Sequence, residues 1–217
     1  MARRIKVNGQ FADKAGAQVV DDDVVEVTEL DHPFVGRGGM KLDHALRHFS
    51  ISVEGKVGLD IGASTGGFTD VMLKQGARKV FAVDVGYGQL DQSLREDPRV
   101  VVREKTNARY LELADFDEPV DFISIDVSFI SLELILPAAR KILRPGGELV
   151  GLIKPQFEVG KKDVGKGGIV RDTAKRDQVV DRIRTFATGL GFIVAGVTES
   201  PIKGMEGNVE FLMWCRS

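Results

Sequence analysis

The chain has 217 residues, of which 43% are hydrophobic, so it is long enough for one α/β domain with a packed core and a small additional piece. Thirty basic and 32 acidic residues give a formal net charge of -2, which excludes a uniformly basic surface and requires any nucleic-acid partner to meet a local patch. The single cysteine excludes an internal disulfide, and no signal peptide or long apolar span is evident, so we expect a cytoplasmic protein.

Residues 1–30 read as a small β-rich piece. A short strand and an Asn-Gly turn are expected over 6–10, and an alternating apolar pattern predicts another strand over 24–27. So short a piece rarely buries enough surface to fold alone. Its basic residues, Arg3, Arg4 and Lys6, are suited to phosphate contacts, although a solvated basic terminus explains them equally well.

A glycine-rich segment over 36–39 precedes a helical pattern over 40–49. Lys41 lies just inside this helix and, taken alone, reads as a surface lysine. His44 and His48 are one helical turn apart, but no cysteine or further histidine motif accompanies them. We therefore expect no metal site.

The stretch 57–68 reads as strand, glycine-rich turn and helix, with the pattern D-x-G-x-S-x-G-G-F. This is neither G-x-G-x-x-G nor a P-loop, because the P-loop lysine is missing. A nucleoside without phosphate, such as S-adenosylmethionine, fits such a turn better than a nucleotide does; a tight turn without ligand is the alternative. Asp84 ends the next apolar run at the distance where related folds place an acid on ribose hydroxyls.

Further apolar runs over 100–102, 122–125 and 149–153 alternate with helical patterns, among them a helix over 132–143 that Arg144–Gly147 should stop. Such runs predict a parallel sheet with helices on both faces. Asn107 follows one run, where it could face an adenine edge or belong to a plain turn. In parallel sheets a ligand lies at the carboxyl ends of the strands, and four polar residues end strands here: Asp60, Asp84, Asp126 and Lys154.

The remaining segments are a basic, glycine-rich loop over 155–171, a helix over 173–190 and strands over 192–197 and 209–214. If the last two strands form a hairpin, the final strand is antiparallel to its neighbours and begins at the ligand edge. Glu210 would then lie beside Asp126 and Lys154.

These segments together resemble the FtsJ-type ribose methyltransferase superfamily, most closely the TlyA or haemolysin-A-like rRNA methyltransferases. The pieces that carry the resemblance are GRGGMKLDHAL, LDIGASTGGFTDVML, VFAVDVGYGQL, DFISIDVSFISL, LIKPQFE, GGIVRD and GNVEF. The resemblance implies a Rossmann-like S-adenosylmethionine-dependent fold over residues 31–217, with a mostly parallel sheet and an antiparallel last strand. Residues 1–30 resemble the tail of an alpha-L RNA-binding domain whose first helices are missing.

The resemblance also implies site residues. The expected catalytic tetrad is Lys41, Asp126, Lys154 and Glu210. The residues expected at S-adenosylmethionine are Asp60, Gly62, Ala63, Ser64, Gly66, Gly67, Phe68, Asp84, Asn107 and Asp126. The residues expected at RNA are Arg3, Arg4, Lys6, Arg37, Lys161, Lys162, Lys166 and Arg171.

Lys154 is the candidate base for a ribose 2'-hydroxyl. Burial and Lys41 favour its neutral amine, whereas Asp126 and Glu210 favour the ammonium, and the sequence does not decide between them. The expected activity is S-adenosylmethionine-dependent 2'-O-methylation of ribosomal RNA, either as RNA or within ribosomal subunits. The alternatives are a catalytically weak module that binds cofactor and RNA, and a membrane-active haemolysin, which the absence of a spanning or strongly amphipathic basic helix disfavours. The oligomeric state does not follow from the sequence.

Overall fold

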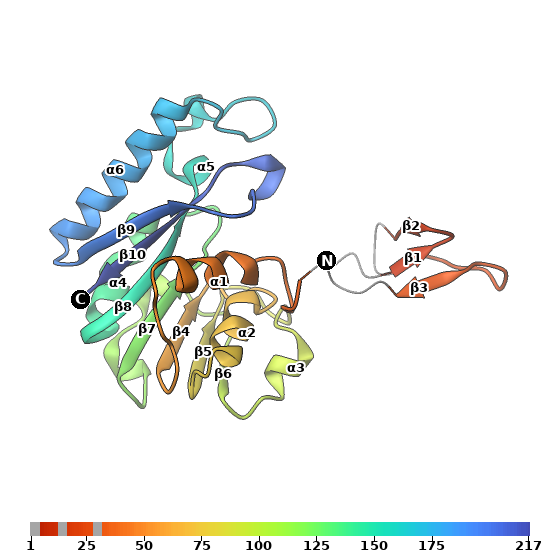
Figure 1. Ribbon diagram of the computed structural model, residues 1–217, viewed down its shortest axis with the longest axis horizontal. Coiled ribbons are helices and arrows are strands. Elements are labelled where there is room, and N and C mark those ends of the chain that lie inside the picture. The colour runs from red at the N-terminus through yellow and green to blue at the C-terminus, as the bar shows by residue number, and fades with distance from the viewer. Residues whose placement is uncertain (1–4, 13–16, 28–31) are drawn as a thin grey trace.

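The computed structural model describes residues 5–12, 17–27 and 32–217. Within these ranges the chain forms one large mixed sheet covered by helices and a separate three-stranded sheet near the amino terminus (Figure 1). Across the same part of the chain, no helix combines the length and the apolar character needed to span a membrane.

The large sheet has the strand order β6-β5-β4-β7-β8-β10-β9. Its strands are β4 (Val57–Ile61), β5 (Lys79–Val83), β6 (Val100–Arg103), β7 (Val120–Ile125), β8 (Leu143–Ile153), β9 (Ile193–Glu199) and β10 (Phe211–Arg216). The first five strands pair in parallel, and β10 is antiparallel to both β8 and β9. The predicted fold class, including the antiparallel last strand, is confirmed.

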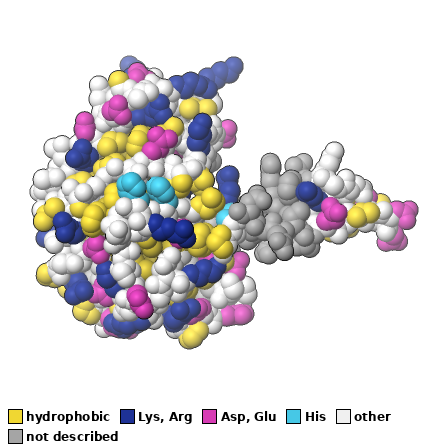
Figure 2. Space-filling model, in the orientation of Figure 1, with side chains coloured by type: hydrophobic (Ala, Val, Ile, Leu, Met, Phe, Trp, Pro, Cys, Tyr) yellow, Lys and Arg dark blue, Asp and Glu magenta, His cyan; other side chains and the backbone are white. Residues whose placement is uncertain are grey.

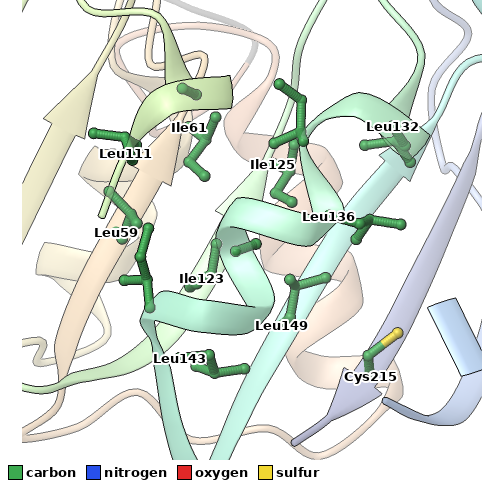
Figure 3. Packing of buried hydrophobic residues seen from close by; sticks show 14 of the residues in the cluster. Leu59, Ile61, Leu111, Ile123, Ile125, Leu132, Leu136, Leu143, Leu149 and Cys215 are labelled. Atoms are coloured by element: carbon green, nitrogen blue, oxygen red, sulfur yellow. The ribbon is translucent and has the colours of Figure 1, made fainter. Parts of the chain in front are cut away.

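Two hydrophobic layers fill the two faces of this sheet. One face carries α1 (Gly39–His48), α2 (Gly67–Lys74) and α3 (Gln92–Arg95), and the other carries α4 (Leu136–Ile142) and α6 (Thr173–Gly189). Successive residues of β5 alternate between them: Val80 and Ala82 pack under α1 and α2, whereas Phe81 and Val83 pack on the α4 side. Figure 3 shows this second layer, in which leucine and isoleucine side chains from β4, β7, β8 and α4 interdigitate.

Short elements complete the domain. The short helix α5 (Pro155–Glu158) directly follows β8, and 3₁₀ turns occur at η1 (Ala108–Tyr110), η2 (Leu113–Asp115), η3 (Leu132–Leu134), η4 (Lys161–Asp163) and η5 (Met205–Gly207).

The helix predicted over 132–143 is not continuous. Its first turn is the 3₁₀ turn η3, and α4 begins only at Leu136, with Pro137 in its first turn. Proline lacks a backbone N–H and is tolerated only in the first turn of a helix, so the α-helix cannot extend back to Leu132. The helix ends at Ile142, within one residue of the predicted end, and β8 begins at Leu143 opposite Val120.

The amino-terminal sheet contains β1 (Ile5–Val7), β2 (Gln10–Phe11) and β3 (Val25–Val27) in the order β2-β1-β3. Asn8 and Gly9 both have positive φ, as a two-residue hairpin turn requires. The Asn8 side chain then joins the next connection, because it donates to Asp23 and accepts from the Val24 N–H. The predicted strands of this piece are confirmed, whereas its assignment to an RNA-binding domain stays a prediction.

Candidate active site

The four residues of the predicted tetrad form two buried ion pairs. Lys41 Nζ lies 2.6 Å from Glu210 Oε2, and Lys154 Nζ lies 2.5 Å from Asp126 Oδ1. Lys41, Lys154 and Glu210 are buried, and Asp126 is half-buried. Because burial makes an unpaired charge costly, each lysine is held by its carboxylate partner in one place.

The sheet topology explains why these residues meet. Asp126 and Lys154 directly follow the parallel strands β7 and β8, so they lie at the same edge. In the antiparallel pairing of β10 with β8, Phe211 stands opposite Ile153. The next residues outward are Glu210 and Lys154, so the start of β10 meets the end of β8.

The helix that carries Lys41 is docked on the glycine-rich turn by close backbone contact. A Cβ atom on Gly67, at the start of α2, would lie 2.8 Å from the backbone nitrogen of Gly39, at the start of α1. Any side chain at Gly67 would therefore push the two helix starts apart, and Lys41 would move with α1.

Two further polar side chains complete the environment of the lysines. Lys154 Nζ donates to Ser128 Oγ at 2.9 Å. Gln156 Nε2 donates to Glu210 Oε1 at 3.0 Å, so Gln156 and Lys41 engage different oxygens of the same carboxylate. A lysine between hydrogen-bonding partners at a sheet edge has the chemistry needed to position a hydroxyl group and, as the neutral amine, to receive its proton.

The glycine-rich turn packs closely against this edge of the sheet. Gly62 has a φ of 86°, and a Cβ atom there would lie 2.4 Å from the backbone oxygen of Asp126. The carboxylate of Asp84 accepts the Ser64 N–H at 2.8 Å and the Gly86 N–H at 2.7 Å. Asp84 thereby fixes the loops after β4 and β5 and, being half-buried, keeps lone pairs for a ligand hydroxyl.

Accessibility divides the residues predicted at the cofactor into two groups. The exposed or half-buried members, which are able to touch a ligand, are Gly62, Ser64, Asp84, Asn107 and Asp126. The buried members, which support the turn from within, are Asp60, Ala63, Gly66, Gly67 and Phe68. Phe68 belongs to the hydrophobic layer under α1 and α2, because residues at the inner face of a helix start pack into the core.

Asp60 is fully buried in the middle of the sheet. Its two oxygens accept hydrogen bonds from Thr69 Oγ1 at 2.7 Å and from Ser124 Oγ at 3.0 Å, so it joins β4 to α2 and β7. Burial raises the pKa of Asp60 to about 7, against the opposing effect of these two hydrogen bonds. With 0% of its surface exposed, Asp60 lies behind the glycine-rich turn.

Asn107 caps the turn η1, since its side chain accepts the Arg109 N–H at 3.1 Å. This is the plain-turn alternative for the residue. The side chain is exposed, so its amide NH₂ group stays available to an adenine edge.

The residues predicted at RNA fall into three sets. Arg3 and Arg4 lie outside the described residues, and Lys6 is half-buried on β1. Arg37 is exposed just before α1. Lys162, Lys166 and Arg171 are exposed in the loop between α5 and α6, to which the turn containing Lys161 also belongs. Figure 2 shows Lys and Arg side chains at the end of the molecule where Figure 1 places this loop.

Sequence reasoning missed Ser128 and Gln156 at this edge, and it also missed Phe129. Phe129 is 80% exposed, its φ is 63°, and its ring lies 4.9 Å from that of Phe157, which lies 5.9 Å from Lys154 Nζ. A bulky residue rarely adopts positive φ, and a large exposed ring is uncommon beside a buried ionic site. Neither property leaves a signal in the sequence, so only the structure identifies the residue.

Comparisons with known proteins found similar sequences and a similar solved structure. Residues 34–217 match the FtsJ-like methyltransferase family. The 16S/23S rRNA (cytidine-2'-O)-methyltransferase TlyA of Mycobacterium tuberculosis is 46% identical over 100% of this chain and 81% of its own length. Hemolysin A of Brachyspira hyodysenteriae is 44% identical over 98% of this chain and 88% of its own length. The solved structure of a candidate hemolysin from Streptococcus thermophilus has a TM-score of 0.86 at 48% identity, covering 100% of this chain and 80% of that one.

The buried carboxyl of Asp60 should make folding stability depend on pH. Its pKa of about 7 lies above the ordinary value of 3.8, so between these pH values the folded protein holds a proton that the unfolded chain releases. The free energy of unfolding should therefore fall as pH rises from about 4 to about 7, by up to about 4 kcal/mol from this group. Asp60→Asn should lack this fall.

Urea denaturation of both proteins at half-unit pH steps measures the effect, because the groups common to both cancel in the difference. Parallel curves for the wild type and Asp60→Asn would contradict the assignment of a raised pKa to Asp60.

Proposed function

The chain belongs to the FtsJ-like methyltransferase family, and from this premise we propose that it transfers a methyl group from S-adenosylmethionine to a ribose 2'-hydroxyl of ribosomal RNA. The observation that carries the proposal is the pair of buried ion pairs, Lys41–Glu210 and Lys154–Asp126, at the edge beside the glycine-rich turn. The name of the relative from Mycobacterium tuberculosis supports ribosomal RNA and the 2'-hydroxyl as target. A ribosomal RNA substrate would place the protein in the cytoplasm.

The residues of the turn fit S-adenosylmethionine. Gly62 allows the turn to pack directly on the backbone of Asp126 at the end of β7, and Asp84 offers carboxylate oxygens to ribose hydroxyls. Backbone groups of Gly62 and Ser64 would face the methionine part, and Asn107 would face the adenine. The cofactor, when bound, supplies an electrophilic methyl group on a sulfonium.

The chain's own residues then handle the hydroxyl. In the proposed step Lys154 acts as a neutral amine and takes the 2'-hydroxyl proton onto Nζ, while Ser128 and Asp126 keep that nitrogen in place. The ammonium formed is stabilised by the Asp126 carboxylate. Lys41, held by Glu210, is the second lysine at this site.

Phe129 is suited to hold the base of the target nucleotide. Its ring is exposed and is supported from the side by Phe157, whose own ring lies 5.9 Å from Lys154 Nζ. A base that stacks on an aromatic ring contributes about 1–3 kcal/mol, largely independent of sequence. The proposal therefore gives Phe129 the role of fixing the nucleotide whose ribose faces Lys154.

The base role of Lys154 is tested with Lys154→Ala. Loss of a general base should lower turnover by about 10²–10⁴-fold, and the dissociation constant for S-adenosylmethionine should stay within a few-fold. Methyl transfer to ribosomal RNA and calorimetric titration of the cofactor give the two values, with the exposed Lys141→Ala on α4 as the matched control. Turnover of Lys154→Ala within twofold of the wild type would show that Lys154 is not the general base.

The stacking role of Phe129 predicts a graded series. Phe129→Leu should lower kcat/KM for RNA by roughly 5–150-fold, because it keeps an apolar side chain but removes the aromatic face. Phe129→Trp should keep most of the activity. Equal kcat/KM for the wild type and both variants would show that the ring does not hold a base.

The loop between α5 and α6 is proposed to contact the RNA backbone. Replacing Lys161 and Lys162 by Ala should weaken RNA binding and flatten the dependence of log K on log salt by about 1.4, if each lysine contacts one phosphate of single-stranded RNA. The matched control removes Arg47 and Lys141, which are exposed and distant in sequence from the loop. If the loop variant and the control both keep the wild-type slope of log K against log salt, Lys161 and Lys162 do not contact phosphates.

A further inference from the structure

The short helix α5 contacts three separate parts of the active site. It begins one residue after Lys154, and each side chain after Pro155 has a different partner. Gln156 holds Glu210, Phe157 packs against Phe129, and Glu158 binds the chain at Ser131 and Leu132. The proposed function already gives roles to Glu210 and Phe129, but it gives none to Glu158.

Glu158 is an almost inaccessible carboxylate with a full set of donors. Its side chain is 1% exposed. Oε2 accepts the Ser131 hydroxyl at 2.7 Å and Arg182 Nη2 at 2.9 Å, and Oε1 accepts the Leu132 N–H at 2.8 Å. Burial raises the pKa of this carboxyl, whereas Ser131, Leu132 and Arg182 oppose that effect. A carboxylate is costly to bury, and an apolar side chain in its place could not hydrogen-bond to the chain. We therefore expect the hydrogen bonds of Glu158 to hold a backbone segment in position.

The segment that Glu158 fixes is the one that carries the partners of Lys154. It leaves β7 at Asp126, whose N–H is bonded to the Ile61 carbonyl, and it ends at Ser131 and Leu132. Asp126 and Ser128 both bind Lys154 Nζ, and Phe129 has its strained positive φ between the two ends. Such a conformation persists only where the surroundings determine it, and Glu158 is the side chain that anchors its far end.

We propose that Glu158 is a positioning residue for the methyl transfer. It touches neither substrate nor cofactor, and it acts by anchoring residues 126–132 so that Asp126, Ser128 and Phe129 keep their places around Lys154. Arg182, on α6, completes the anchor from the solvent side. This inference rests on the proposed function for its effect on turnover, but its effect on the position of the segment can be measured without any activity.

Glu158→Gln tests the inference against the matched control Glu133→Gln. Arg182 Nε also pairs with Glu133 Oε1, at 3.1 Å, so the control removes a charge from the same arginine without touching the anchor of residues 126–132. In Glu158→Gln, amide hydrogen exchange over 126–132 should be at least about tenfold faster than in the wild type and in the control. Exchange unchanged in Glu158→Gln would overturn the inference, whether or not the protein methylates RNA.

Turnover supplies the second readout. Glu158→Gln should lower kcat about tenfold or more while KM for S-adenosylmethionine stays within twofold, which a general loss of folded protein would not produce once concentrations are corrected by calorimetry. Ser131→Ala removes the hydroxyl that donates to Glu158. It should also lower kcat and speed amide exchange over 126–132, by smaller factors than Glu158→Gln does. If Glu158→Gln does not fold, the Ser131→Ala variant alone tests whether this contact positions residues 126–132. Faster exchange with unchanged kcat would overturn the positioning role. If the wild type shows no methyl transfer, the proposed function is overturned, but the exchange rates still test whether Glu158 anchors residues 126–132.

Discussion

The antiparallel pairing of β10 with β8 is the constraint on which the active site depends. Parallel strands deliver Asp126 and Lys154 to one edge, but their register alone supplies no second carboxylate. Because β10 runs in the opposite direction between β8 and β9, its start reaches that edge and brings Glu210 to Lys41. The glycine contact between the starts of α1 and α2 then sets how far Lys41 reaches. A shift of β10 by one residue would turn Glu210 to the other face of the sheet.

The site is held by buried polar contacts that tolerate little change. The tetrad contains two lysines and two carboxylates, so every buried charge has a partner, and removal of one member leaves the other uncompensated. Asp60 behind the glycine-rich turn and Glu158 behind the Lys154 partners extend this arrangement away from the ligand side. Together they make the edge a preorganised environment in which donors and acceptors are in place before a substrate arrives.

The sequence predicted the parts of this structure that depend on local pattern. Strands followed from apolar runs, and the edge of the site followed from the polar residue that ends each run, so Asp84, Asp126 and Lys154 were placed correctly. Roles that depend on tertiary packing were not predictable. Phe68 and Asp60 have the same spacing whether they face a ligand or the core, and only burial separates them. The partners of Glu158 lie 24 to 27 residues away in the chain, and the positive φ of Phe129 leaves no trace in composition. The apolar pattern over 132–143 predicts one continuous helix, but Pro137 requires the α-helix to begin no more than one turn before it.

Methyl transfer from labelled S-adenosylmethionine to ribosomal RNA and to ribosomal subunits, followed by nucleoside analysis of the product, tests the central claim most directly. The account predicts label in a 2'-O-methylated nucleoside, because in the proposed mechanism Lys154, held by Asp126 and Ser128, takes the proton of a ribose hydroxyl. Label in a methylated base would contradict the account. Binding of cofactor and RNA without any methyl transfer would contradict it as well, and would instead identify a cofactor- and RNA-binding module.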